Sequence, residues 1–254
     1  MRYIKISSAI LILTAITITF ACKSNQSNAV INKIQKITTL QPVNVIDLSS
    51  ILIEPSGIVY NENSHSLLIV SDARPYIYVF DFNGKILNQI SVSGVDMEGI
   101  ALSKNSDTIY VVEETAKLVS SFSYNGTKIN SMVVDVSTNP GHILEGITVD
   151  NNGNIFVINE KFPAMLLEFS GSKELSRQEI TFTSDLSDIC YDKSLDCFWI
   201  VSDESKKIIK IDRDGSLLGE WLIPFEKGEG ITLVQDKMYI VCDSDSKMYV
   251  FQKP

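Results

Sequence analysis

The sequence predicts an all-β protein, a five-bladed β-propeller with four strands in each blade. Three observations predict this fold. A short module recurs five times at nearly constant spacing, each copy offers four short runs rich in β-branched and aromatic residues, and no comparable helix pattern accompanies them. The chain has 254 residues, enough to bury a sizeable core.

The first element of each copy is a short motif that ends in isoleucine, with glycine before the isoleucine in four copies. Its leading residue recurs after 42, 47, 42 and 42 residues. A period of this length is typical of propeller blades and of helical solenoids. We call the leading residues the first column; they are Ser56, Glu98, Glu145, Ser187 and Glu229.

The second element is a β-branched and aromatic run that ends in an acid, as at residues 67–72 and 198–203. Short runs of this composition are typical of buried strands. We call the acids at their ends the second column; they are Asp72, Glu114, Glu160, Asp203 and Asp243.

The third and fourth elements form a hairpin in each copy. Alternating runs at residues 77–80 and 208–211 lead into Asn83-Gly84 and Asp214-Gly215, and both dipeptides are strong hairpin signals. The fourth runs follow at residues 86–92, 128–136, 175–182 and 217–223.

The last copy ends after its third run, at residues 248–251, and lacks a fourth strand. Residues 43–48, just ahead of the first copy, can supply that strand and so close the ring and remove a hydrophobic edge. We therefore expect one propeller domain over residues 43–254. Six blades with one degenerate blade are the alternative, but too little sequence is left for four more strands.

The amino-terminal segment has the pattern of a targeting signal. Arg2 and Lys5 precede an uncharged apolar stretch over residues 6–20, which is typical of a signal peptide at residues 1–21. The following Cys22 ends a motif that resembles a bacterial lipobox and would carry acyl chains such as palmitate. Residues 22–42 then read as a lipidated cysteine and a flexible tether. Alternatively, Cys22 is an ordinary cysteine after a secretory signal.

Composition excludes several classes of function. The net charge of −9 becomes −11 once Arg2 and Lys5 are removed, and this acidic surplus argues against a nucleic-acid partner. His65 and His142 are the two histidines, so a three-histidine metal site cannot form.

Three cysteines follow the predicted lipidation site. Cys190 and Cys197 either pair across a tight hairpin or remain free, and Cys242 is expected to be a buried free thiol.

The two columns predict an acidic site at one end of the ring. Neighbouring strands are antiparallel, so the start of the first strand and the end of the second lie at the same end. Crowded carboxylates must take up protons, water or cations. We expect oxygen ligands for Ca²⁺ from Glu98, Glu145, Glu229 and Asn159. A ligand would then contact the second column and an adjacent lysine, namely Asp72, Glu114, Glu160, Lys161, Asp203 and Asp243.

Structural roles are possible at the same positions. The aspartates of the second column are candidate turn residues that bond their own loop backbone. Gly57, Gly99, Gly146 and Gly230 suit crowded innermost strands where backbones approach closely. Basic residues after the second runs either pair on the surface or hold an anionic ligand; they are Arg74, Lys117, Lys161, Lys206 and Lys247. His142 either overhangs the channel or is solvated.

The chain resembles the SdiA-regulated, or YjiK-like, family of bacterial envelope propellers over residues 43–251. The order of the matching segments carries the resemblance, because no single motif is specific. They are Glu-Pro-Ser-Gly-Ile (54–58), Asp-Met-Glu-Gly-Ile-Ala (96–101), Val-Glu-Glu (112–114), Asn-Glu-Lys (159–161), Asp-Leu-Ser-Asp (185–188), Ser-Asp-Glu-Ser (202–205) and Gly-Glu-Gly (228–230). The resemblance implies a membrane-associated propeller and assigns no catalytic residues.

Three functions fit these features. The first is a membrane-anchored binding module of the cell envelope that holds a cation and binds a small molecule or an envelope protein. The second is a calcium-dependent hydrolase of lactones or phosphoesters, because the channel glutamates with Asn159 resemble the ligand set of gluconolactonase-like and paraoxonase-like propellers. The third is a structural scaffold. Fold alone does not choose among them.

Overall fold

The computed structural model describes residues 37–136 and 143–254. The predicted signal peptide, Cys22 and His142 lie outside the described residues. Within the described ranges, no helix has both the length and the hydropathy that crossing a bilayer requires.

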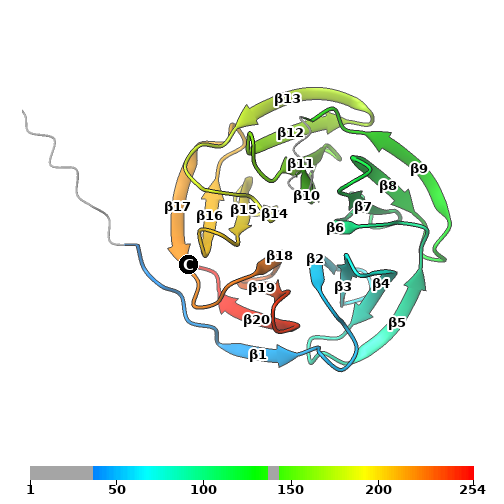
Figure 1. Ribbon diagram of the computed structural model, residues 1–254, viewed down its shortest axis with the longest axis horizontal. Coiled ribbons are helices and arrows are strands. Elements are labelled where there is room, and N and C mark those ends of the chain that lie inside the picture. Colours follow the sequence, from blue (N-terminus) through cyan, green and yellow to red (C-terminus); the bar gives the residue numbers. More distant parts are fainter. Residues whose placement is uncertain (1–36, 137–142) are drawn as a thin grey trace, which may run out of the picture. The chain divides into compact units, whose positions relative to one another are not determined.

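The described residues form five antiparallel sheets of four strands in a ring, which confirms the predicted five-bladed β-propeller (Figure 1). Blade 1 contains β2 (Pro55–Asn61), β3 (Ser66–Ser71), β4 (Arg74–Phe80) and β5 (Ile86–Ser91), and blade 2 contains β6 (Met97–Leu102), β7 (Ile109–Glu113), β8 (Leu118–Phe122) and β9 (Lys128–Val133). Blade 3 contains β10 (Leu144–Val149), β11 (Ile155–Asn159), β12 (Met165–Ser170) and β13 (Lys173–Glu179), and blade 4 contains β14 (Asp188–Asp192), β15 (Cys197–Ser202), β16 (Lys207–Ile211) and β17 (Leu217–Leu222). Blade 5 contains β18 (Gly228–Val234), β19 (Lys237–Cys242), β20 (Lys247–Gln252) and β1 (Asn44–Asp47).

The strand β1 completes the fifth blade, as the sequence predicted. It pairs antiparallel with β20, and Val45 lies opposite Tyr249. Just before β1, the backbone N–H of Leu40 donates to the carbonyl oxygen of Leu222 in blade 4, at 2.8 Å. The ring is therefore closed by hydrogen bonds between the two ends of the described chain.

The hydrophobic core lies between the blades. The second strands β3 and β15 are buried along their whole length, whereas the outermost strand β13 is largely exposed. Neighbouring blades interdigitate, and the ring centroids of Phe156 in β11 and Phe198 in β15 lie 4.6 Å apart. A strand covered on both faces reads as a continuous hydrophobic run, which explains the second element of the repeat.

Glycine follows the first-column residue in four blades because neighbouring innermost strands touch there through their backbones. A Cβ atom on Gly57 would lie 2.5 Å from the carbonyl oxygen of Glu98, and one on Gly99 would lie 2.4 Å from that of Glu145. Such distances are below van der Waals contact, so the predicted close approach of backbones is confirmed. We call these contacts the glycine girdle; it consists of Gly57, Gly99, Gly146 and Gly230.

Blade 4 has Asp188 where the other blades have glycine. Its side chain is buried, its Oδ2 accepts a hydrogen bond of 2.8 Å from the backbone N–H of Ile231 in blade 5, and its Oδ1 lies 2.6 Å from where a Cβ on Gly146 would stand. Burial raises the pKa of Asp188 well above its usual range. The Asp188 carboxyl group therefore fills space within the girdle and joins blade 4 to blade 5.

The three cysteines of the described residues are free thiols, so the alternative of a Cys190–Cys197 disulfide is wrong. The register of β14 and β15 places Cys190 opposite Trp199 and Cys197 opposite Asp192, so the two cysteines lie diagonally across the hairpin. Cys242 is buried, as expected.

We predict that Gly99→Ala lowers the free energy of unfolding by about 3 kcal/mol, because its added methyl group meets backbone that cannot rotate away. Urea denaturation measures the loss. Gly171→Ala is the control, since nothing lies within 4 Å of the added Cβ and the cost is the strain of its φ of +59°, about 1 kcal/mol. An equal loss in both variants would contradict the role of the girdle.

Candidate functional site

A β-bulge presents the first-column residue in four of the five blades. The pairing of the innermost strand with the second strand shifts register between Pro55 and Gly57 in blade 1 and between Gly228 and Gly230 in blade 5. Equivalent shifts occur between Met97 and Ile100 in blade 2 and between Leu144 and Ile147 in blade 3. A bulge re-aims the side chain of its extra residue, so Ser56, Glu98, Glu145 and Glu229 all escape the normal alternation of the strand.

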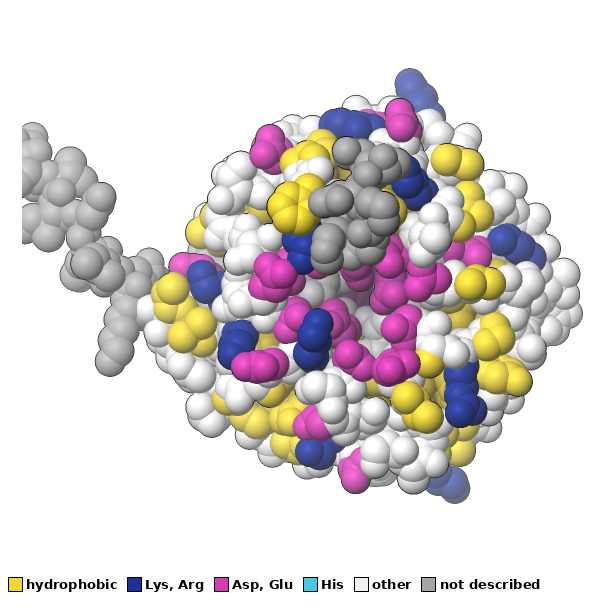
Figure 2. All heavy atoms as spheres, in the orientation of Figure 1, with side chains coloured by type: hydrophobic (Ala, Val, Ile, Leu, Met, Phe, Trp, Pro, Cys, Tyr) yellow, Lys and Arg dark blue, Asp and Glu magenta, His cyan; other side chains and the backbone are white. Residues whose placement is uncertain are grey.

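All ten residues of the two columns line one cavity of about 330 Å³, as Figure 2 illustrates by the carboxylates around its central hollow. We call it the acidic cavity. Its lining contains eleven acidic side chains and two lysines among the described residues. The expected ligand-binding residues Asp72, Glu114, Glu160, Lys161, Asp203 and Asp243 are all in the lining, together with Glu98, Glu145 and Glu229.

Asn159 lies apart from this lining. Its side-chain amide nitrogen donates to the carbonyl oxygens of Lys161 at 3.0 Å and Pro163 at 2.7 Å, so it shapes the loop after β11. The expected ligand set of three glutamates with Asn159 is therefore not gathered around the cavity as one group.

A third set of residues in the site was not predicted from the sequence. It stands two residues before the first column in each blade, and Glu54, Asp185 and Lys227 of this set line the acidic cavity. Asp96 occupies the same position in blade 2. Glu54, Asp96 and Lys227 adopt positive φ angles of 50°, 58° and 59°, a conformation that strand periodicity does not reveal. Their constant offset from the first column is the signal that identifies them.

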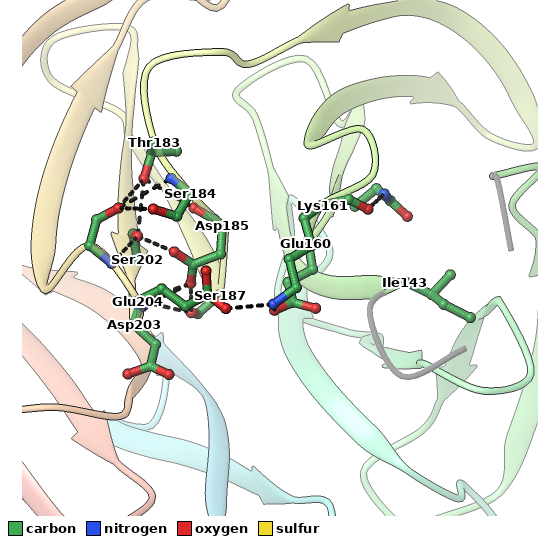
Figure 3. Close-up of polar contacts among 12 residues, drawn as sticks. Ile143, Glu160, Lys161, Thr183, Ser184, Asp185, Ser187, Ser202, Asp203 and Glu204 are labelled. Carbon is green, nitrogen blue, oxygen red and sulfur yellow. Dashed lines mark hydrogen bonds and ion pairs between the residues drawn. The ribbon is translucent and has the colours of Figure 1, made fainter. Parts of the chain in front are cut away.

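Asp185 fixes the loop that carries Asp203 and Glu204 (Figure 3). Its carboxylate accepts hydrogen bonds from the Ser202 hydroxyl and from the backbone N–H groups of Asp203 at 3.0 Å and Glu204 at 3.3 Å. Asp96 does the same in blade 2, where it accepts from the backbone N–H of Thr115 at 3.1 Å. These two aspartates hold the second-column acids in place.

The two lysines join neighbouring blades across the acidic cavity. Lys161 lies 2.9 Å from Glu160 in blade 3 and 2.7 Å from Glu204 in blade 4, as Figure 3 shows. Lys227 lies 2.9 Å from Asp203, whose Oδ1 also accepts the Lys227 backbone N–H at 2.6 Å. Asp203 therefore bonds the loop of the next blade, rather than its own.

The remaining basic residues of the predicted set have other roles. Lys206 pairs with Glu226, and Lys247 pairs with Asp245 at 2.9 Å, in agreement with surface pairing. Lys117 donates to the carbonyl oxygen of Val136, and Arg74 is exposed.

Burial and crowding make several of the carboxyl groups hard to ionise. Burial first, and the neighbouring carboxylates second, raise the pKa of Glu98 to about 9 and the pKa of Asp72 to about 6. Burial and Asp203 raise the pKa of Glu229 to about 7, and the pKa of Glu145 lies well above its usual range for the same kinds of reason. Near neutral pH the cavity therefore retains protons unless another cation replaces them.

One group of carboxylates has a spacing that suits a metal ion. Oxygen atoms of Asp96, Glu98 and Glu114 lie within 4.8 Å of one another. Oxygen-only donors favour a hard cation such as Ca²⁺ or Mg²⁺. These three carboxylates belong to blade 2, and Glu145 and Glu229 line the same cavity from blades 3 and 5.

Several solved structures share the fold at low identity. A virginiamycin B lyase from Staphylococcus aureus aligns with 15% identity and a TM-score of 0.51. The alignment covers 78% of this chain and 66% of the lyase. A gluconolactonase from Xanthomonas campestris aligns with 12% identity and a TM-score of 0.55, covering 83% of this chain and 89% of the gluconolactonase. A chain of a nidogen/laminin complex aligns with 14% identity and a TM-score of 0.56 over 78% of this chain and 76% of its own.

These similarities show the propeller fold and no more, because the identities are low. No protein of curated function matches the sequence. A family model does match, over residues 39–221 and 172–253, and so spans the whole ring of blades. The chain therefore belongs to the SdiA-regulated family.

Proposed function

We propose that this chain is a membrane-anchored binding protein of the bacterial cell envelope, which holds a divalent cation in the acidic cavity and uses that site to bind a small molecule or an envelope protein. One observation carries the proposal. The acids that recur in every blade converge on a single cavity, where eleven acidic side chains face two lysines. A scaffold without a ligand has no need of so costly an arrangement.

The residues present fit a calcium ion. Asp96, Glu98 and Glu114 offer carboxylate oxygens at a spacing that one ion can bridge. Bound Ca²⁺ would favour the charged form of Glu98, whose pKa is otherwise raised to about 9. Lys161 and Lys227 already engage Glu160 and Asp203, and within the described part of the chain neither lies within ion-pair distance of the three carboxylates of blade 2.

The cavity leaves room for a ligand beside the ion. Its volume of about 330 Å³ is at the lower end of the range typical of small-molecule pockets. Asp72, Asp203 and Asp243 line the part contributed by blades 1, 4 and 5, away from the three carboxylates of blade 2. A bound molecule would meet hydrogen-bond acceptors on that side.

We expect Ca²⁺ to raise the melting temperature of the purified protein. An ion at one hundred times its dissociation constant adds about 2.7 kcal/mol, which corresponds to roughly 5–10 °C for a domain of this size. Thermal-shift measurements with Ca²⁺, Mg²⁺ and EDTA test this. The double variant Glu98→Gln, Glu114→Gln should lose the shift, whereas Glu62→Gln, at an exposed position outside the lining, should keep it. A melting temperature that neither ion raises would contradict the proposal.

A pH titration tests the crowding of the carboxylates separately. The pKa of Glu98 rises from 4.5 to about 9 on folding, so between these values the folded chain holds a proton that the unfolded chain has lost. Stability in EDTA must then fall as the pH rises through this window. Glu98→Gln removes this contribution, and we expect its stability relative to the wild type to increase from pH 5 to pH 8. Parallel urea-denaturation profiles of the two proteins would contradict the raised pKa.

A calcium-dependent hydrolase is the second candidate, and Glu229 favours it. Its pKa of about 7 suits a general acid or base at neutral pH, and Lys227 lies 3.7 Å away. Ca²⁺ would polarise the carbonyl or phosphoryl oxygen, and Glu229 would take a proton from the attacking water.

We expect no calcium-dependent turnover in a panel of lactones, phosphomonoesters and phosphodiesters, each assayed with and without Ca²⁺. Turnover that requires Ca²⁺ and is lost in Glu98→Gln or Glu145→Gln would instead establish the hydrolase.

The membrane anchor is proposed from the sequence alone. The apolar stretch before Cys22 and the small residue at position 21 support lipidation of that cysteine. We expect the wild-type protein to partition into the detergent phase of a Triton X-114 extract and Cys22→Ser to stay in the aqueous phase. Equal partitioning of both proteins would exclude an anchor on Cys22.

A further inference from the structure

A second cavity, of about 410 Å³, lies at the opposite end of the ring from the acidic cavity. It is lined by the last residues of the innermost strands, such as Tyr60 of β2, Val149 of β10 and Leu233 of β18. The acidic cavity is lined by residues at the start of the same strands. The glycine girdle and Asp188 therefore lie between the two cavities. All five blades contribute to the second cavity.

The part of the second cavity that lies nearest the glycine girdle along the strands is built by another repeated position, three residues after the first column. It is occupied by Val59, Ala101, Thr148, Cys190 and Thr232. The Thr148 hydroxyl oxygen accepts the backbone N–H of Tyr191 at 3.0 Å, which leaves its own proton to donate. Burial raises the pKa of the Cys190 thiol to about 12, so this position carries no charge.

One part of the wall of the second cavity is apolar, among a lining that is otherwise largely polar. Val59, Tyr60, Val149 and Leu233 belong to innermost strands, yet they are only half-buried. An apolar side chain left partly exposed in a concave site gains free energy when a ligand covers it.

The acids near the second cavity are already neutralised. Asp150 lies 2.7 Å from Arg213, and Asp192 lies 2.9 Å from Lys253. The two cavities therefore differ in charge, and the second does not repel an anion as the first does.

Two lysines lie on the rim of the second cavity. Lys193 of blade 4 lies 3.0 Å from Glu62 of blade 1, and both side chains are exposed. Lys104 of blade 2 is also on the rim, and residues 37–136 and 143–254 offer it no carboxylate partner within 4.0 Å. One lysine is thus left to receive an anionic group.

We infer that the second cavity binds a small organic monoanion with an apolar body, such as an aromatic or acyl carboxylate or sulfonate. The apolar body lies between Tyr60 and Leu233, and the anionic group pairs with Lys104. A hydrogen bond from Thr148 fixes the inner end of the ligand. This site is independent of the cation and of the function proposed for the acidic cavity.

The fluorescent probe anilinonaphthalene sulfonate, an aromatic sulfonate, tests the inference on the purified mature protein. We expect a saturable rise in probe fluorescence with a stoichiometry of one. Lys104→Glu should weaken binding by about tenfold, because it reverses the charge that faces the sulfonate. Ala101→Phe should abolish binding, because Ala101 lines the cavity and the added ring occupies space that the ligand needs.

Two control variants locate the probe. Glu98→Gln alters the acidic cavity, and Val133→Asp alters an exposed apolar residue of the outer strand β9; both should bind the probe as the wild type does. Near-ultraviolet circular dichroism checks the fold of Ala101→Phe. Lys104→Glu tests the same site without disturbing the core, because Lys104 is exposed. Unsaturable fluorescence, or binding that survives both Lys104→Glu and Ala101→Phe, would overturn the inference, as would binding lost in Val133→Asp.

Discussion

The close contact of the innermost strands, through bare backbone in four blades and through Asp188 in blade 4, is the constraint on which the rest of this molecule depends. Gly57, Gly99, Gly146 and Gly230 allow the strands to approach until a Cβ atom would collide with the next blade. A ring of five blades has little space at its centre. At the level of the girdle a side chain fits only where it fills a gap that the neighbouring strand leaves. Asp188 is the one that does so, and its carboxyl group bonds to the backbone of the adjacent blade.

The girdle also explains why the two ends of the ring differ so much in chemistry. Directly beside the glycines, bulges turn the glutamates of the first column towards the acidic cavity, where they are crowded and partly desolvated. Beyond the glycines, the same strands continue through residues such as Val59, Thr148 and Leu233, and the nearby Asp150 and Asp192 are paired with Arg213 and Lys253. One repeat therefore builds two cavities with different linings at the two ends of the ring.

The fold and the two columns could be predicted because the repeat fixes the phase of every blade. The orientation of single side chains, which depends on a shift of one or two residues, could not be predicted. Glu160 lines the acidic cavity, whereas Asn159, the last residue of β11, turns its amide nitrogen to the carbonyl oxygens of the following loop. Glu54 and Lys227 reach the cavity from loops with positive φ, which hydrophobic periodicity does not encode. The diagonal placement of Cys190 and Cys197 follows from the register of their hairpin, and no spacing in the sequence reveals that register.

The pairing of β1 with β20 in the fifth blade sets the order in which the blades can be completed. Because β1 pairs with β20, residues 44–47 cannot complete their blade until a strand about 200 residues later in the chain is available. Until then blade 5 is incomplete and an unpaired edge is available to other chains. Blade 5 is therefore the last blade to be completed, and the exposed edge of β20 disappears only when β1 pairs with it.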